Sequence, residues 1–501
     1  MLNDIKTAIQ LLKNGKSPGN YELINELSVG VNFISDFWKD RYLDEYILEG
    51  GSKIKFVTGN SGSGKTHFLE LLSALADVSG YICTSISAKQ VWVHDFKNIY
   101  IEALKQSDII SCLKKCSHII IRELGYDESE IPNDLSFVDY LSGKGLMDPI
   151  TKREIRLLLN KMFLHNPLVD NNFALACSLI TGGILGHPTL EEPNKALLIS
   201  WLMGEKEATL PAIRRLGLSP SKITKYNARH MLRSLVEIIK ISGKSGVIIT
   251  IDNLDILVNT GSLEEVRYTK QKREDAYESI RELIDEIDTL KNVMFVFAFD
   301  RKLIDDEAAG LKSYWALWMR IQNEVTGEKL NKFTDILDLD RLAMQEYNAG
   351  VIVEMSKRLA KVLEDVDFSV KPISDDQASK ILSRIHYASI PRQINRVTIN
   401  GPEVEAGDVA PINGPEVGNG DAAPIITPEA EAGDVAPINA PEAGNGDIVT
   451  ISKPEAEAGD VAPINMPEAE ADDVAPITGL GAGNGDVVTS MGLEGEGDDR
   501  F

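Results

Sequence analysis

The residues best suited to chemistry lie in one glycine-rich segment, GNSGSGKTH at positions 59–67. Up to Thr66 it matches the pattern G-x-x-x-x-G-K-[ST], in which glycines let backbone N–H groups surround phosphates. Lys65 is expected to reach the β- and γ-phosphates of a nucleotide, and the Thr66 hydroxyl to bind Mg²⁺. The segment predicts an ATP-binding site formed by Gly59, Asn60, Ser61, Gly62, Ser63, Gly64, Lys65, Thr66 and His67.

A second group of candidates follows an apolar run, GVIITIDNLDIL at positions 246–257. The run predicts a buried strand that delivers Asp252 to its carboxyl end, where parallel sheets bind ligands. Asp252 is expected to hold Mg²⁺, directly or through water; the alternative is a turn aspartate. Asn253 stands where glutamate commonly activates the attacking water, and an amide cannot accept that proton, although it can orient the water. Asp255 is the nearest carboxylate that can substitute.

Three further charged residues are candidates for sensing the phosphates. Asp300 ends the apolar run VMFVFAFD and is either a polar sensor or the N-cap of the next helix. Arg320, in SYWALWMRIQNEV, is either an arginine finger serving a neighbouring subunit or an exposed helical arginine. Arg392, in SIPRQINRV, is expected to read the γ-phosphate from a small helical domain.

A sheet and several helices must position these residues. Apolar runs at 53–58, 247–251 and 293–300 predict buried strands of a parallel sheet. Amphipathic helices are predicted after the glycine-rich segment, through ARHMLRSLVEIIKI with Asn227 as its cap, and through EDAYESIRELIDEIDTL. The expected fold class is therefore α/β, a P-loop nucleoside-triphosphatase core.

The chain divides into four predicted regions. In chain order they are a helical lead-in at 1–50, the core at 51–340 with a helical insertion at about 87–245, a small helical lid at 341–397, and a repeat tail at 398–501.

The tail consists of thirteen-residue units such as PEAEAGDVAPINA. Residues 397–501 contain 22 acidic and two basic side chains, whereas the rest of the chain contains 54 acidic and 50 basic ones. Each unit has few apolar side chains, too few to offset an ordering cost of about 1–2 kcal/mol per residue. A disordered acidic tail is therefore expected, and a β-solenoid or a calcium-binding repeat is the alternative.

The remaining features indicate a cytoplasmic protein. The start of the chain lacks the apolar core of a signal peptide, and no apolar run approaches the roughly 20 residues that span a bilayer. The four cysteines are expected to be reduced structural thiols. A metal site at Cys112, Cys116 and His118 is the alternative, but the usual closing ligand pair is absent.

A basic stretch at 211–236 carries six cations and no acidic residue. Such a stretch can bind nucleic-acid phosphates, face the nucleotide of a neighbouring subunit in a homo-oligomer, or form a solvated face. No helix-turn-helix, zinc finger or winged helix accompanies it. The six cations are Arg214, Arg215, Lys222, Lys225, Arg229 and Arg233.

Over about residues 20–397 the chain resembles the ATP-binding proteins of BREX phage-defence systems, within the AAA+ group. The resemblance rests, in order, on GNSGSGKTHFLE, YNARHMLRSLVEIIKISGKSGVIITIDNLD, EDAYESIRELIDEID, GLKSYWALWMRI and IPRQINR. It implies an AAA+-like ATPase that works with other defence proteins near DNA, a methyltransferase among them. Asn253 departs from the family pattern, in which glutamate tends to follow the aspartate.

Three functions are consistent with these features. The first is an ATP-dependent motor or switch in phage defence. The second is an ATP-stabilised scaffold or regulator without turnover. The third, an origin-recognition-like DNA loader, predicts a winged helix that the sequence lacks.

Overall fold

The computed structural model describes Thr7, Leu11, Leu12 and residues 21–400, apart from 260–264, 326–330, 365–367 and 385–389. The chain divides into two units, Met1–Ile412 and Asn413–Phe501, and all described residues belong to the first. The predicted repeat tail, from residue 401 onwards, lies outside the described residues. Within the described part of the chain, no helix is both long enough and apolar enough to cross a bilayer.

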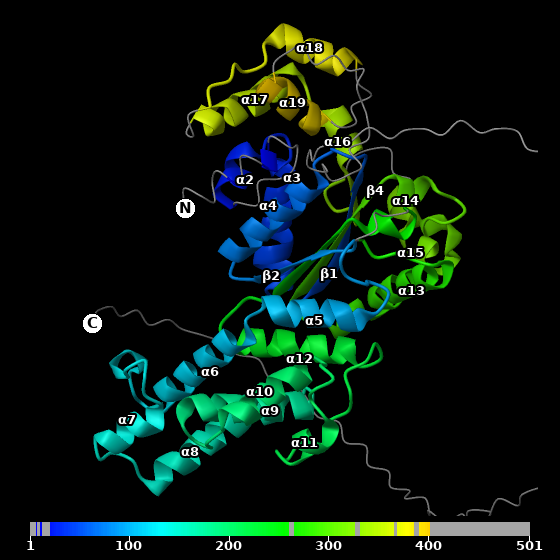
Figure 1. The fold of residues 1–501 in the computed structure, drawn as a ribbon. Helices are drawn as coiled ribbons and strands as arrows, with labels where there is room; N and C mark the ends of the chain where they lie inside the picture. Colours follow the sequence, from blue (N-terminus) through cyan, green and yellow to red (C-terminus); the bar gives the residue numbers. More distant parts are fainter. Residues whose placement is uncertain are drawn as a thin grey trace, which may run out of the picture. The chain divides into compact units, whose positions relative to one another are not determined.

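The core of the first unit is a five-stranded sheet in the order β2-β3-β4-β1-β5, and every strand pair is parallel (Figure 1). This confirms the predicted α/β class with a parallel sheet. β4 lies between β1 and β3, where an AAA+-type sheet would have it. The strands are β1 Ser52–Gly59, β2 Ile82–Ser87, β3 Val247–Asp252, β4 Val293–Asp300 and β5 Ile336–Asp338.

The register brings the carboxyl ends of these strands to one edge of the sheet. Gly59 lies opposite Asp300, and Ser87 lies opposite Asp252. Thr58 lies opposite Asp338, so β5 ends at the same edge. Because parallel strands all point the same way, polar residues that follow apolar runs far apart in the sequence meet here.

Both faces of the sheet are covered, which explains why the central strands β3 and β4 are almost entirely apolar and buried. Phe295 and Phe297 face one core, and Met294 and Val296 face the other. Burial of one such side chain stabilises the fold by about 1.5–3 kcal/mol. Figure 1 shows α4 and α13 on opposite sides of the strands.

The helices divide between these two cores. All helices between β2 and β3 lie on the Phe295 side: α5 Phe96–Gln106, α6 Ile109–Glu123, α7 Phe137–Gly143, α8 Pro149–Leu159, α9 Asn171–Leu185, α10 Glu192–Leu202, α11 Leu210–Arg214 and α12 Ala228–Ile241. Three later helices join them: α13 Lys270–Glu286, α14 Lys302–Asp305 and α15 Trp315–Val325. Those on the other side are α2 Tyr21–Leu27, α3 Asn32–Trp38, α4 Lys65–Val78, α16 Leu339–Glu346, α17 Ala349–Glu364, α18 Asp375–Arg384 and α19 Ile390–Asn400.

The predicted cap of α12 differs from the structure. Asn227 occupies the N-cap position, but its side chain makes no capping hydrogen bond to the helix. Its Oδ1 instead accepts from the Thr224 N–H at 2.7 Å, and its Nδ2 donates to the Lys222 carbonyl at 3.0 Å. The predicted start of the helix is confirmed, but the side chain of Asn227 bonds to the preceding turn instead of capping the helix.

Three of the four thiols lie on helices α6 and α9, and the fourth, Cys83, lies on β2. Cys112, Cys116 and Cys177 are buried and Cys83 is half-buried, all as free cysteines. Burial raises the pKa of Cys83 and of Cys116 to about 12. No cluster of three or more metal-ligating side chains occurs among the described residues, so nothing there supports the metal alternative.

The last helix sets the point at which the tail can be removed. α19 continues past Val397, and the buried Thr398 hydroxyl shares a 2.8 Å hydrogen bond with Ser356 of α17. Ile399 packs against Leu359 and Leu363.

We expect a chain ending at Gly401 to keep the melting temperature of the full chain, because the tail adds no core. A chain ending at Val397 should melt at a lower temperature, since it leaves the buried Ser356 without Thr398, a loss of about 1–3 kcal/mol. Thermal unfolding of the two truncations and the full chain checks this. A large loss of stability already at Gly401 would mean that the repeats fold onto the body.

Candidate functional site

The glycine-rich loop joins β1 to α4 and depends on backbone conformations that favour glycine. Gly62 and Gly64 have φ of +90° and +100°. A Cβ atom on Gly62 would meet the Arg392 side chain at 3.0 Å, so a larger residue would crowd that side chain and also strain the backbone. The loop runs directly into the first turn of α4, so backbone N–H groups of the loop and of the helix start are available to phosphate oxygens.

Lys65 points back across this loop. Its Nζ donates to the Gly59 carbonyl at 2.7 Å and to the Asn60 carbonyl at 3.0 Å. Asp300 Oδ2 lies 3.9 Å from the same Nζ. Burial lowers the pKa of Lys65, and four surrounding carboxylates, those of Asp300, Asp255, Asp252 and Asp340, oppose that effect. The ammonium group is therefore held at the loop, where a phosphate would meet it.

Thr66 and Asp252 come together at the start of α4 and the end of β3. The Thr66 hydroxyl donates to Asp252 Oδ2 at 2.6 Å, and the other carboxylate oxygen accepts from the Asn253 N–H at 2.7 Å. Burial raises the pKa of Asp252, while these hydrogen bonds and Lys65 lower it. An adjacent hydroxyl and carboxylate are oxygen ligands of the kind that Mg²⁺ uses beside nucleotide phosphates, so the donor set fits that ion.

Asn253 has a left-handed backbone, with φ +60° and ψ 34°. Asparagine tolerates this conformation far better than glutamate does. Its Oδ1 accepts from the Ser87 hydroxyl at 3.2 Å, which joins the ends of β2 and β3. This local geometry gives a physical reason for an amide at the position.

Asp255 and Asp300 are tied to each other. Asp255 Oδ1 accepts from the Asp300 N–H at 3.1 Å, and its Oδ2 accepts from Asn259 Nδ2 at 3.0 Å. Asp300 Oδ1 accepts from the Lys302 N–H at 3.2 Å, but the N-cap position of the short α14 belongs to Arg301, so the N-cap alternative for Asp300 was wrong. Asp300 lies beside Lys65, and its role as a polar sensor stays a prediction.

Arg392 reaches the loop from α19. Its guanidinium donates to the Ser61 hydroxyl at 3.2 Å. The structure therefore brings a cation from the carboxyl-terminal helices to the phosphate loop, where the sequence predicts a phosphate sensor.

His67 faces away from the loop and connects it to the amino-terminal helices. Its Nε2 lies 2.8 Å from the Ser28 hydroxyl, which itself donates to the Ile24 carbonyl at 2.7 Å. Since a hydroxyl has one proton, His67 must donate through Nε2–H. Burial lowers the pKa of His67 to about 4, so the ring is neutral. Ser28 also accepts, through its carbonyl, from Arg358 of α17 at 3.2 Å.

Two residues at this edge escaped the sequence analysis. Asp340 accepts from the Asn60 N–H at 2.8 Å and from Asn60 Nδ2 at 2.9 Å, and it is only 2% exposed. Arg301 donates to Asp338 at 2.7 Å. The acidic pair in ILDLDRL was the available signal, since Asp338 ends β5 and Asp340 follows it by two residues.

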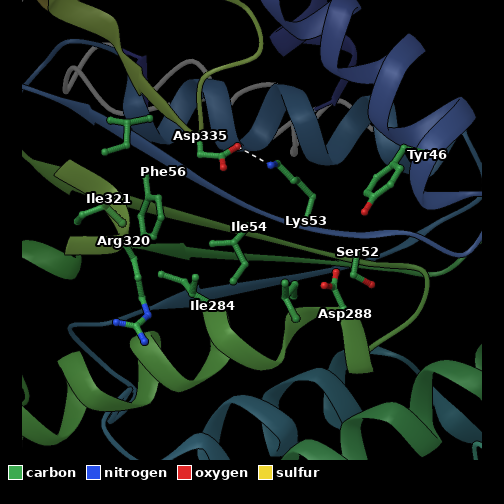
Figure 2. Close-up of a pocket in the computed structure, with 12 residues that line it drawn as sticks. Tyr46, Ser52, Lys53, Ile54, Phe56, Ile284, Asp288, Arg320, Ile321 and Asp335 are labelled. Atoms are coloured by element: carbon green, nitrogen blue, oxygen red, sulfur yellow. Dashed lines mark ion pairs between the residues drawn. The ribbon is translucent and has the colours of Figure 1, made fainter. Parts of the chain in front are cut away.

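Arg320 lies away from this edge. It forms a bidentate ion pair with Asp285 of α13, with N–O distances of 2.5 Å and 2.7 Å. Figure 2 shows it beside Ile54 and Ile284, lining a cavity of about 180 Å³ along the first half of β1. Ser52 and Lys53 at the start of β1 line the same cavity, whereas the phosphate loop follows the other end of that strand. Arg320 therefore does not reach the site of its own chain, and a role in a neighbouring subunit stays a prediction.

The basic stretch is divided by the fold. Arg229 pairs with Glu282 at 2.7 Å and stacks on Phe96, and Arg233 donates to the Leu168 carbonyl at 3.2 Å. These two side chains serve the packing of α12. The exposed cations of the stretch are Arg214, Arg215, Lys222 and Lys225.

A glycine-rich loop between a parallel strand and a helix, with lysine, threonine and an aspartate of a second strand at one edge, defines a P-loop nucleoside-triphosphate-binding protein. The family of BREX system ATP-binding proteins BrxC/D matches residues 3–397. The chain belongs to this family and is an ATP-binding protein of a BREX defence system. No curated protein and no solved structure matches the chain.

Proposed function

We propose that this chain is an AAA+-type ATPase that acts as a motor or switch within a BREX complex. The observation that carries the proposal is the contact of Thr66 with Asp252, 2.6 Å apart, beside the ammonium group of Lys65. Together they offer two oxygen ligands for Mg²⁺ and one cation for the phosphates, which are the parts that nucleotide hydrolysis needs.

The carboxyl-terminal helices are the proposed moving part. Arg392 of α19 contacts the loop at Ser61, and Arg358 of α17 contacts Ser28, the residue that holds His67. A bound γ-phosphate would compete with Ser61 for Arg392, so nucleotide state would alter how these helices dock. In this way α16–α19 would serve as a lid that reports ATP.

A second function, that of an ATP-stabilised scaffold, is favoured by Asn253. Its amide cannot take a proton from water, and its Oδ1 is already bonded to Ser87. Other proteins of the same defence system, a DNA methyltransferase among them, are the proposed partners. A homo-oligomer would give Arg320 a neighbouring nucleotide to act on.

The metal assignment is tested with Thr66→Val, which keeps the shape of the side chain and removes its hydroxyl. We expect the wild type to bind ATP more tightly in the presence of Mg²⁺ than in the presence of a chelator. In Thr66→Val, this gain in ATP affinity should be smaller by at least about tenfold. Calorimetric titration with ATP, with and without Mg²⁺, measures both.

The matched control is Thr289→Val, which removes an exposed hydroxyl that donates to the Glu286 carbonyl. It should bind as the wild type does. An unchanged Mg²⁺ dependence in Thr66→Val would contradict the assignment.

A further inference from the structure

A cluster of aromatic rings and cations lies outside the phosphate site, where the segments that follow β2 and precede α12 and α13 meet. We refer to it as the aromatic–cation patch. Its members are Trp92, His94, Lys225, Tyr226, Tyr268 and Lys272.

Three rings of the patch hold one another in place. The ring centroid of Trp92 lies 5.2 Å from that of His94 and 5.1 Å from that of Tyr268. The Tyr268 hydroxyl accepts from the Val93 N–H at 2.9 Å, and the Val266 N–H donates to the Lys89 carbonyl at 2.9 Å. Two segments far apart in the sequence thus form one ordered surface.

The cations of the patch lie on or beside these rings. Lys272 Nζ is 3.6 Å from the centre of the Trp92 ring, and Lys225 Nζ is 5.3 Å from that of Tyr226. Burial and then the charges of Lys272 and Lys225 lower the pKa of His94, so both lysines lie near that ring. Tyr226 is 87% exposed, which leaves its ring available to a ligand.

The first turn of α13 adds further positive charge. It contains Lys270, Lys272 and Arg273 and no acidic residue, and Arg267 precedes it. Cations at this end of a helix oppose its dipole, so helix stability does not explain them.

Nearby carboxylates offset only part of this charge. Asp95 caps α5 by accepting from the Lys97 N–H, and Asp275 accepts from the Gln271 amide at 3.3 Å. Glu274 lies 3.9 Å from Lys270. Lys222, three residues before Lys225 in the segment that precedes α12, is exposed as well.

We propose that the aromatic–cation patch binds single-stranded nucleic acid. The lysines would bind backbone phosphates, and the exposed Tyr226 ring would stack on a base. In a duplex the base faces are already stacked, and an acidic protein segment has no planar bases to offer. Rings interleaved with cations therefore fit a single strand better than either.

The patch is connected to the nucleotide site through Ser87 and through Ala88, whose N–H donates to the Asp252 carbonyl at 2.9 Å. The segment that carries Trp92 and His94 starts directly after Ser87, whose hydroxyl donates to Asn253 beside the metal-binding Asp252. If nucleic-acid binding moved this segment, the position of Asn253 would therefore change as well. Binding itself uses none of the phosphate-loop residues, so it can be measured without ATP.

Fluorescence anisotropy of the full chain with an oligothymidylate of about 30 nucleotides, and with a duplex of equal length, tests the proposal. Tyr226→Leu should raise Kd for the single strand at least about fivefold, the smallest loss expected when one stacked base is removed. Tyr226→Phe keeps the ring and should restore binding. Lys272→Gln should reduce the slope of log Kd against log salt by about 0.7, as the loss of one phosphate contact predicts.

Trp315→Leu is the matched control, since Trp315 is a 66% exposed ring on α15 outside the patch, and it should leave Kd unchanged. Without ATP, Lys65→Ala should also bind the single strand as the wild type does. A failure of the nucleotide assignment can therefore be distinguished from a failure of the nucleic-acid proposal. The proposal is overturned if the wild type does not bind the single strand, or if Tyr226→Leu binds it unchanged. A duplex bound as tightly as the single strand would also overturn it.

Discussion

Replacing Lys65 by alanine is expected to weaken ATP binding by about 10- to 150-fold. The Lys65 ammonium lies at the phosphate loop, and loss of a hydrogen bond to a charged group costs about 1.5–3 kcal/mol. Turnover should fall below detection, because the same charge would stabilise the transferred phosphate. Equilibrium titration with ATP and a phosphate-release assay measure the two effects.

Lys161→Ala is the matched control, because Lys161 is an exposed lysine in a weak ion pair with Glu123 at 3.9 Å. It should bind ATP and turn it over as the wild type does. Thermal unfolding of Lys65→Ala shows whether the loop survives the loss of its two carbonyl contacts. Unchanged ATP affinity in a folded Lys65→Ala protein would refute the phosphate-loop assignment.

Replacing Asn253 by a carboxylate is expected to accelerate ATP hydrolysis. The isolated wild type should bind Mg·ATP and hydrolyse it slowly, since general-base help contributes about 10²–10⁴-fold and Asn253 cannot supply it. Asn253→Asp is the sharper test, because aspartate also tolerates φ +60°. Asn253→Glu resembles the family pattern more closely, but it should also lower the melting temperature, since a left-handed glutamate costs about 1–2 kcal/mol.

Two further variants complete this experiment. Asn253→Gly keeps the backbone conformation without adding a carboxylate, and it should not accelerate turnover. Asp255→Asn keeps an oxygen to accept from the Asp300 N–H and loses only the exposed bond from Asn259, so a lower rate at an unchanged melting temperature would report lost proton acceptance rather than lost structure. Steady-state phosphate release is the measurement. Fast hydrolysis by the isolated wild type, insensitive to changes at both positions, would contradict this account and would also exclude the scaffold function.

The sequence by itself determined the phosphate loop and the strand that carries Asp252, because both are local patterns. Glycines at positive φ and a helix that starts at Lys65 are encoded within a few consecutive residues. Likewise, the buried residues of β3 end at Ile251, so the next residue, Asp252, lies at the edge of the sheet. The family follows from the same ordered motifs.

Only the tertiary structure decided which distant residues contact the phosphate loop. Hydrophobic periodicity indicates which face of a strand or helix is buried, but not which distant element packs there. Asp340 reaches Asn60, and Arg392 reaches Ser61, because β5 lies beside β1 and α19 docks on the loop. The pairing of Arg320 with Asp285 depends likewise on how α15 packs against α13.

The conformation and contacts of Asn253 were likewise decided by the tertiary structure. Its residue type was readable from the sequence, but its left-handed backbone and its bond to Ser87 arise only when β2 and β3 end side by side. Contacts across such distances depend on strand order and helix packing, which no short stretch of the chain encodes.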